Sequence, residues 1–225
     1  MECNNPLYQK QGIHTVNAIF TVQKGVLKLI LIKRINNPFK DMWALVSGAI
    51  YNNETFEDGT AREIFEKTGL KNLNTKMFGL FSALDRSPDM RMIGVGNISV
   101  IDSKKVELEN HALASTNCDW FDVKKMPGKL AFDHDMIFQK ALEYLKAQIY
   151  KTDIVKSLLP SEFTMPMLHS IYEAVLEKKI DRRNFSKKIL NLNLVKDLHK
   201  MENDVNKKPA KLYAFKKDTG IQDIY

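Results

Sequence analysis

Residues 48–70, GAIYNNETFEDGTAREIFEKTGL, decide how the rest of the chain is interpreted. Glu54 follows Gly48 after five intervening residues, and the run Arg62-Glu63-Ile64 follows Glu54 after seven more. Apolar residues recur at near-helical spacing from residue 55 to residue 68, and Gly69 is a typical C-terminal stop. The stretch therefore predicts one amphipathic helix with an acidic face.

Two carboxylates of this helix are candidate metal ligands. Glu63 and Glu66 are three residues apart, so a helix places them on one face, where they repel each other unless a cation neutralises them. Hard oxygen ligands suit Mg2+ or Mn2+, which could bind a diphosphate and activate water. Lys67, four residues after Glu63, would compete with that metal. Taken alone, these residues also fit a solvated helix face with an i,i+4 ion pair.

The full spacing resembles the Nudix box, G-x5-E-x7-R-E-U-x-E-E-x-G-U, in which U is an aliphatic residue. Every named position matches except Lys67, which stands where the family carries the last glutamate of its metal-binding cluster. Around Gly48, Val46-Ser47 replaces the usual Pro-Gly, and Tyr51 replaces a common acidic residue. These departures predict a Nudix-like domain that binds its ligand without turning it over.

Composition indicates a soluble globular protein of one large or two modest domains. The chain has 225 residues, of which 44% are hydrophobic and 27% are charged. No signal-like segment and no run of membrane-spanning length occurs, so we expect a cytoplasmic protein without a membrane partner. Cys3 and Cys118 are too few for a disulfide framework or a zinc site, and the five histidines lack metal-ligand spacing.

The positive charge is concentrated in the last third of the chain. The net charge is +7; residues 1–150 carry 19 Lys and Arg against 17 Asp and Glu, and residues 151–225 carry 15 against 10. A basic segment favours a polyanionic partner, although solubility alone would explain a mild excess.

The first part of the chain reads as an α/β domain. Runs rich in β-branched and aromatic residues predict strands at 13–22, 26–34, 43–50, 75–84, 91–101 and 116–123. A second helix is predicted from residue 135 to 149, with Asp133 as its N-cap. A mixed sheet between two helices gives an α/β/α sandwich, the fold that the Nudix resemblance implies.

Two short segments supply candidate ligand residues. Asp85-Arg86-Ser87-Pro88 resembles the D-R-x-P loop, and Phe132-Asp133-His134 the F-D-H segment, of Nudix regulators related to ADP-ribose. Arg86 and Arg91 could hold a phosphate by charge-assisted hydrogen bonds, and His134 is a further candidate contact. Without the family context, the alternative interpretation of the first segment is an ordinary turn. The alternative for His134 is an ordinary capping or packing residue.

The last third of the chain is predicted to form a separate module after a linker at 151–162. A helix at 164–178, with Thr164 as its cap, precedes a second helix at 181–190. In the second helix, Phe185, Ile189 and Leu190 are expected to face inward. Strands at 194–199 and 211–215 follow, which completes the order of a winged helix-turn-helix.

The exposed face of this module suits DNA. Arginine and asparagine on a recognition helix can read base edges in the major groove, and lysines on a wing can hold phosphates. The candidate DNA-binding residues are Arg182, Arg183, Asn184, Ser186, Lys187, Lys188, Lys207, Lys208 and Lys211. The alternative is a basic helical hairpin that merely covers the first domain.

A Nudix domain at 1–150 followed by a winged helix-turn-helix at 151–225 resembles the Nudix-related bacterial transcriptional regulators of the NrtR and AraR kind. The segments Leu159-Pro160-Ser161-Glu162-Phe163-Thr164 and Arg182-Arg183-Asn184-Phe185 extend the resemblance into the basic module. It implies a dimeric repressor that binds an operator in double-stranded DNA and senses ADP-ribose, a related nucleotide or a sugar. Spacing does not report pocket shape, so these effectors all stay open.

The alternative hypothesis, from another class, is an Mg2+-dependent pyrophosphatase acting on ADP-ribose or a similar nucleoside diphosphate derivative. Glu63 and Glu66 would then be the catalytic, metal-binding residues, and Glu54 would assist them. Arg62 is expected to orient a glutamate through an ion pair. Lys67 argues against this activity.

Overall fold

The computed structural model describes residues 10–105, 118–202 and 209–216. The chain divides into two compact units, and each is described by itself. The first unit draws on residues 1–20, 29–99 and 107–142, and the second on residues 21–28, 100–106 and 143–225. In the described part of the chain, no helix is both long enough and apolar enough to span a bilayer.

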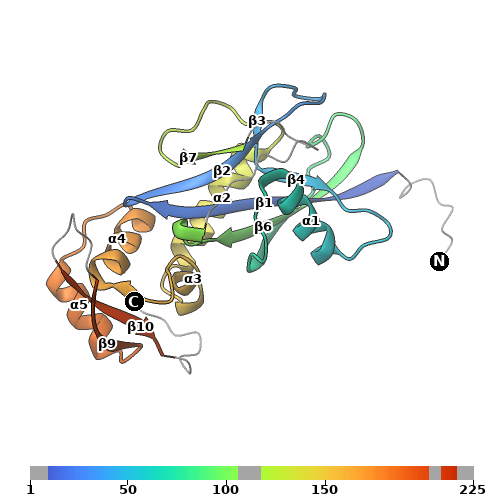
Figure 1. Cartoon of the computed structure of the whole chain (residues 1–225). Helices are drawn as coiled ribbons and strands as arrows, with labels where there is room; N and C mark the ends of the chain where they lie inside the picture. The colour runs from blue at the N-terminus through green and yellow to red at the C-terminus, as the bar shows by residue number, and fades with distance from the viewer. Residues whose placement is uncertain (1–9, 106–117, 203–208, 217–225) are drawn as a thin grey trace. The chain divides into compact units, whose positions relative to one another are not determined.

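A seven-stranded sheet forms the framework of the first unit (Figure 1). Its main path runs β3-β2-β1-β6-β5, while β4 pairs with β1 and β7 with β2. The strands are β1 (Gln11–Gln23), β2 (Val26–Lys33), β3 (Trp43–Ala44), β4 (Val46–Ala49), β5 (Thr75–Phe81), β6 (Arg91–Val100) and β7 (Cys118–Asp122). The predicted first hairpin is confirmed: Lys24 and Gly25, with φ of 50° and 75°, form the turn that joins β1 to β2.

The prediction of one strand over residues 43–50 is wrong. This segment forms β3, which pairs with β2, and β4, which pairs with β1. Leu45 separates the two strands, because its backbone N–H donates to Nδ1 of His134 at 3.1 Å rather than to a neighbouring strand. A contact 89 positions away in the chain cannot be anticipated from local spacing.

The predicted box helix is α1 (Phe56–Thr68). The hydroxyl of Thr55 accepts from the N–H of Asp58 at its start, and Gly69, with φ of 73°, closes its end by donating to the carbonyl of Phe65. The second predicted helix is α2 (His134–Gln148). In Figure 1 the sheet lies between α1 and α2, in agreement with the expected sandwich.

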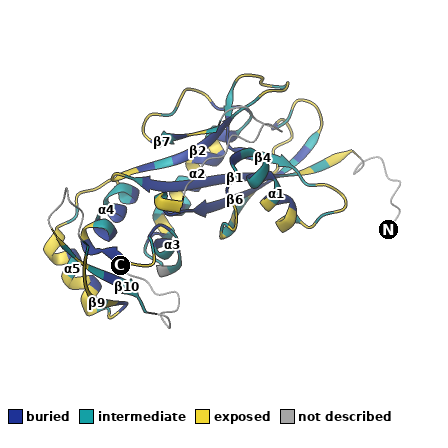
Figure 2. Ribbon diagram, in the orientation of Figure 1, coloured by how far each residue is buried: buried dark blue, intermediate teal, exposed yellow. Residues whose placement is uncertain are grey.

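The hydrophobic core of the first unit is centred on β1 and β2. Burial is continuous over residues 15–22 of β1 and 29–32 of β2, which include Ile19, Phe20 and residues 29–31 at 0% exposure, and Figure 2 shows the buried parts of these strands in dark blue. Strands buried on both faces show an unbroken apolar run instead of strict alternation. These two strands therefore give the rigid base on which α1 and its carboxylates are placed.

The prediction of a linker at 151–162 is wrong, because this segment contains the helix α3 (Thr152–Ser157). Ile154, Val155, Leu158 and Leu159 are all at most 6% exposed. Their spacing is that of a helical apolar stripe, so this segment is packed into the second unit. A 3-10 turn at Ser103–Lys105 belongs to the same unit.

The winged helix-turn-helix is confirmed in the second unit. Its helices are α4 (Met165–Leu176) and α5 (Arg182–Asn191), which begin at the predicted caps Thr164 and Asp181. Its three strands follow the order β8 (Phe163–Thr164), β10 (Ala210–Phe215) and β9 (Val195–Glu202), of which β8 was not predicted.

Leu190 of α5 does not face inward as expected. It is 47% exposed, whereas Phe185 and Ile189 are buried. These two residues are four apart and share the inward stripe, and the next position is rotated by about 100° from it. The face of α5 that points away from the core is therefore wider than predicted.

Candidate functional site

The carboxylate of Glu63 is buried against strand β4. Glu63 is 5% exposed, and a Cβ added at Gly48 would lie 1.9 to 2.2 Å from its carboxylate atoms. Any other residue at position 48 would occupy the space of the carboxylate. The glycine of the sequence pattern is therefore needed for the close approach of α1 to β4.

Arg62 binds three carboxylates and one carbonyl. Its Nε and Nη2 donate to both oxygens of Glu54, at 2.9 and 2.7 Å, and its Nη1 donates to Glu63 at 2.8 Å and to Glu66 at 3.3 Å. Nη2 also donates to the carbonyl of Ala49 at 3.0 Å. The hydrogen bonds from Arg62 lower the pKa of Glu54 to about 2. The predicted orienting role of Arg62 agrees with this geometry.

Lys67 binds the other side of the same glutamate. Its Nζ lies 2.7 Å from Oε2 of Glu63 and also donates to the carbonyl of Ser47. One oxygen of Glu63 thus faces Arg62 and the other faces Lys67. The expectation that Lys67 would share the acidic face is confirmed.

This arrangement does not fit a divalent cation. Within the described ranges, no group of three or more acidic, histidine or cysteine side chains has the geometry of a metal site. Both oxygens of Glu63 already face cationic nitrogens, and Glu66 and Glu54 are bound to Arg62. An Mg2+ ion would have to displace the Lys67 ammonium, which carries a charge of the same sign.

An ion pair joins the two short segments that supplied ligand candidates. The guanidinium of Arg86 donates from Nε and Nη2 to the two carboxylate oxygens of Asp133, both at 3.0 Å. The side chain of Arg86 is only 3% exposed and lies against Gly94, where a Cβ would come within 2.7 Å of it. The carboxylate of Asp133, predicted to cap α2, instead fixes Arg86. Whether Arg86 also binds a ligand stays a prediction.

His134 is fully enclosed beside this pair. It is 2% exposed, and its Nδ1 accepts from the N–H of Leu45. Burial, and then the nearby Arg86 and Arg34 charges, lower the pKa of His134 to about 3, so the ring is neutral near pH 7. The structure places His134 in a packing position, and a ligand contact from it stays a prediction.

His14 of β1 and Arg34, which follows β2, were missed by the sequence analysis. Burial, followed by the charges of Arg86 and Lys67, lowers the pKa of His14 to about 4. Arg34, Arg86 and Lys67 depress the pKa of both His14 and His134, so these side chains surround one region of the first unit. Within this region Lys67 is paired with Glu63 and Arg86 with Asp133, and the guanidinium of Arg34 adds a further positive charge.

Aromatic side chains border this cationic region. The guanidinium of Arg34 lies 4.7 Å from the ring centroid of Phe132, and the Phe39 and Phe132 centroids are also 4.7 Å apart. The Phe132 ring lies 5.4 Å from the ring of His134, and Phe39 remains 38% exposed. No spacing signal pointed to Phe39, because it lies in a loop that only folding brings beside residue 132.

Arg91 of β6 stabilises a loop. Its Nη1 donates to the carbonyls of Ser82 and Ala83, at 2.7 and 2.9 Å. These bonds leave the side chain near the β5–β6 connection that contains Arg86. A phosphate contact from Arg91 stays a prediction.

The outer face of α5 is basic. Its exposed candidates are Arg182, Arg183, Asn184, Lys187 and Lys188. Ser186 is half-buried, and its hydroxyl donates to the carbonyl of Arg182 at 2.8 Å. In the wing, Lys211 forms an ion pair with Asp197 at 3.2 Å, which raises the pKa of Lys211. The candidates Lys207 and Lys208 lie outside the described residues.

The comparison with known families matches both units. The family description "NUDIX domain" matches residues 13–141, which is more than half of the chain. The chain belongs to the Nudix family. The description "NrtR DNA-binding winged helix domain" matches residues 155–215 of this Nudix protein.

Individual relatives agree with this assignment. The chain is 27% identical over 201 residues to an "ADPR responsive transcriptional repressor NtrR" from Acinetobacter baylyi, covering 88% of the chain and 79% of the relative. It is 34% identical over 132 residues to an "ADP-ribose pyrophosphatase" from Methanocaldococcus jannaschii, covering 59% of the chain and 76% of the relative. The crystal structure of Shewanella oneidensis NrtR complexed with a 27mer DNA shares the fold, with a TM-score of 0.78, 23% identity, and coverage of 91% and 93%.

Proposed function

We propose that this Nudix protein is a transcriptional repressor whose DNA affinity depends on ADP-ribose or a related nucleotide. Residues 1–150 would form the effector-binding domain and residues 151–225 the operator-binding domain of a homodimer. Two observations support this function: the relative from Acinetobacter is described as an ADPR-responsive repressor, and the Shewanella protein was crystallised with DNA. A sugar effector has no such support among these relatives.

The observation that carries the proposal is the contact between Lys67 and Glu63. The Nζ of Lys67 lies 2.7 Å from a carboxylate oxygen that the Nudix family would give to a metal. A domain whose acidic cluster is neutralised by its own side chains lacks the donor set for metal-assisted hydrolysis. It would still bind an anionic nucleotide through the guanidinium of Arg34, whose positive charge lies in the neighbouring region.

The effector would bind at this cationic and aromatic region. Phosphate oxygens would pair with Arg86 and Arg91, of which Arg86 is held in place by Asp133. A base would stack on the exposed ring of Phe39, which packs against Phe132, and Phe132 in turn contacts the neutral ring of His134. These roles are consistent with an anionic, aromatic ligand.

The operator would be bound by α5. The helix begins at its cap Asp181 and points Arg182, Arg183, Asn184, Lys187 and Lys188 to solvent. Arginine and asparagine supply base contacts in the major groove, and the lysines supply phosphate contacts. Lys211 would contribute from the wing by exchanging Asp197 for a phosphate.

A gel-shift experiment tests the repressor proposal. The purified protein is expected to shift a DNA fragment from its own upstream region at moderate salt, and ADP-ribose is expected to change the apparent affinity. A double Arg182→Ala, Lys187→Ala variant should lose the shift, whereas Lys140→Ala, which removes an exposed lysine of α2, should retain it. Failure of the parent to shift any such fragment would refute the proposal.

A second candidate function is hydrolysis of ADP-ribose. The 34% identity to an ADP-ribose pyrophosphatase favours it, and Glu63 and Glu66 are still present. The Lys67 contact opposes it. Hydrolysis of ADP-ribose with Mg2+ should be measured for the parent and for Lys67→Glu: activity confined to the variant supports a sensor, and strong activity in the parent supports the enzyme.

A further inference from the structure

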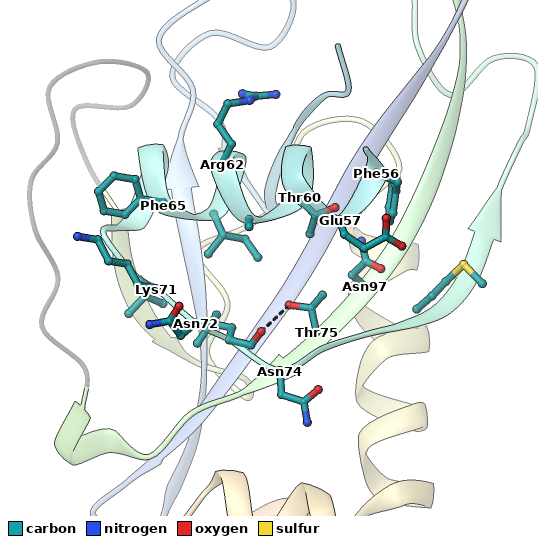
Figure 3. Close-up of a pocket in the computed structure, with 15 residues that line it drawn as sticks. Phe56, Glu57, Thr60, Arg62, Phe65, Lys71, Asn72, Asn74, Thr75 and Asn97 are labelled. Carbon is teal, nitrogen blue, oxygen red and sulfur yellow. Dashed lines mark hydrogen bonds between the residues drawn. The ribbon is translucent and has the colours of Figure 1, made fainter. Parts of the chain in front are cut away.

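A cavity of about 830 Å3 lies beside α1 in the first unit (Figure 3). Its lining comes from α1, the connection that follows α1, β5 and Asn97 of β6. No buried side-chain atom that lacks a hydrogen-bond partner in the described ranges belongs to this lining, and apolar walls alone select no particular ligand. The outer face of α5 in the second unit, in contrast, combines charge with an exposed apolar side chain.

Packing against α4 fixes which side of α5 faces outward. Phe185 is 0% exposed, and its ring centroid lies 5.2 Å from those of both His169 and Tyr172 of α4. Ile189, four residues later, is 1% exposed and continues the same inward stripe. Successive residues of a helix are rotated by about 100°, so the residues within about 60° of the opposite, outward line are those at 183, 184, 187, 190 and 191.

The positive charge on this helix is not compensated within the described part of the chain. Residues 182–191 include Arg182, Arg183, Lys187 and Lys188 and no acidic residue. The structure records no ion pair or hydrogen bond from the side chain of Arg183 or Lys187 to any residue in the ranges 10–105, 118–202 and 209–216. Such a face attracts a polyanion, and it repels the same face of a second copy of the chain.

Leu190 interrupts this cationic face with an apolar side chain. It is 47% exposed, and it lies about one turn after Lys187 and two turns after Arg183. The recognition helices of homeodomains read bases from positions i, i+3, i+4 and i+7, which here are residues 183, 186, 187 and 190. Leu190 therefore faces the base edges when α5 enters the major groove.

The chemistry of the major groove identifies the base that suits a leucine. Base pairs present a pattern of hydrogen-bond donors and acceptors there, and the apolar group in this pattern is the 5-methyl group of thymine. A leucine placed against a donor or acceptor leaves that polar group without a partner, which costs free energy. A leucine placed against the methyl group buries apolar surface, which is favourable.

We propose that Leu190 is a specificity-determining residue that packs against the 5-methyl group of a thymine in the operator. This inference rests on the proposed function, because it concerns the DNA that α5 binds. Arg183 and Lys187 attract the helix to the groove through their charges. Leu190 discriminates thymine from cytosine, which lacks the methyl group.

Deoxyuridine tests the proposal, because its base differs from thymine only in lacking the 5-methyl group. The upstream fragment that the full chain shifts is amplified with dTTP or with dUTP, so the operator sequence need not be known. The parent is expected to bind the uracil fragment at least about fourfold more weakly, the factor that corresponds to the burial of one methyl group. The ratio of the two affinities should fall by about the same factor in Leu190→Ala.

Uracil interference locates the contact at single thymines. Fragments with randomly placed uracils are separated into bound and free fractions and cleaved at uracil, so that positions depleted from the bound fraction mark the methyl groups that binding requires. At least one such position should disappear with Leu190→Ala and persist with Leu190→Met, which retains a long apolar side chain. Met136→Ala removes a similarly exposed apolar side chain from α2, at 41% exposure, and should leave every position unchanged.

Two results would overturn this proposal and leave the repressor function standing. They are equal binding of the thymine and uracil fragments by the parent, and an interference pattern that Leu190→Ala does not change. Equal weakening of Leu190→Ala on both fragments also overturns it, and thermal unfolding and sedimentation of the variant then show whether Leu190 stabilises the fold or joins two copies of the chain. If the parent shifts no upstream fragment, the repressor proposal fails and this one fails with it.

Discussion

Replacing Lys67 with glutamate is expected to destabilise the first domain and to make its stability depend on Mg2+. The Nζ of Lys67 lies 2.7 Å from Oε2 of Glu63, and the two side chains are 14% and 6% exposed. At this distance the Coulomb attraction is about 6 kcal/mol for an effective dielectric constant of 20, and desolvation of the two charges offsets much of it.

The expected loss follows from what remains around Glu63 in the variant. Arg62 still binds its other oxygen at 2.8 Å, so removal of the lysine charge should cost roughly 2 to 4 kcal/mol, somewhat less than for a fully buried pair. The new carboxylate adds repulsion at the same point. A divalent cation between the carboxylates would restore most of this loss.

Urea unfolding followed by tryptophan fluorescence, in EDTA and in MgCl2, measures the effect. Lys67→Met removes the charge without adding a ligand and should be destabilised without a response to Mg2+. Lys71→Glu makes the same charge change at an exposed position beyond the end of α1 and should alter stability by less than about 0.5 kcal/mol. Equal losses for the two glutamate variants, or no recovery with Mg2+, would refute the reasoning.

Three further predictions concern other residues. Gly48→Ala should destabilise the protein by about 1 to 3 kcal/mol in urea, because its Cβ would lie 1.9 Å from Glu63, whereas Gly79→Ala, with its nearest atom at 3.4 Å, should cost less. Burial holds the pKa of His134 at about 3, below its ordinary 6.5. Between these two values the unfolded chain binds more protons than the folded one, so the free energy of unfolding should fall as the pH is lowered from 6.5 towards 3. The variant His134→Gln should flatten this dependence by up to about 1.4 kcal/mol per pH unit in urea unfolding. Lys187→Ala should weaken operator binding and reduce the slope of log K against log salt by about 1, and an unchanged slope would exclude a phosphate contact.

Sequence spacing predicted how the residues of α1 lie relative to one another, but not which residues from other parts of the chain lie nearby. Spacing placed Glu63, Glu66 and Lys67 on one face of a helix, and the observed contacts have that arrangement. Spacing could not place Arg34 or Phe39 beside Phe132, because these residues come from different parts of the chain. Proximity between distant segments depends on how the sheet is assembled, and no local pattern encodes it.

The ion pair of Arg86 is a second contact between distant segments that the local sequence did not predict. The segment around it was recognised from its residues, but its partner Asp133 was assigned to a helix cap. Both roles satisfy a carboxylate, and only the position of the β5–β6 connection relative to α2 selects the ion pair. The packed helix at Thr152–Ser157 was missed for a related reason: Pro160 and the flanking charges suggested a linker, whereas burial of its apolar stripe stabilises a helix.

The sequence by itself determined the family, the two-part organisation, the capped helices and the replacement of a metal-binding glutamate by Lys67. These features depend on residues close together in the chain, where spacing translates directly into a shared helix face or a cap. The tertiary structure alone decided that Lys67 forms an ion pair with Glu63 and donates to Ser47, that Gly48 makes room for Glu63, and that Asn97 lines a separate cavity. Those features require atoms from β4, α1 and β6 to meet, and only the packing of the sheet against the helix brings them together.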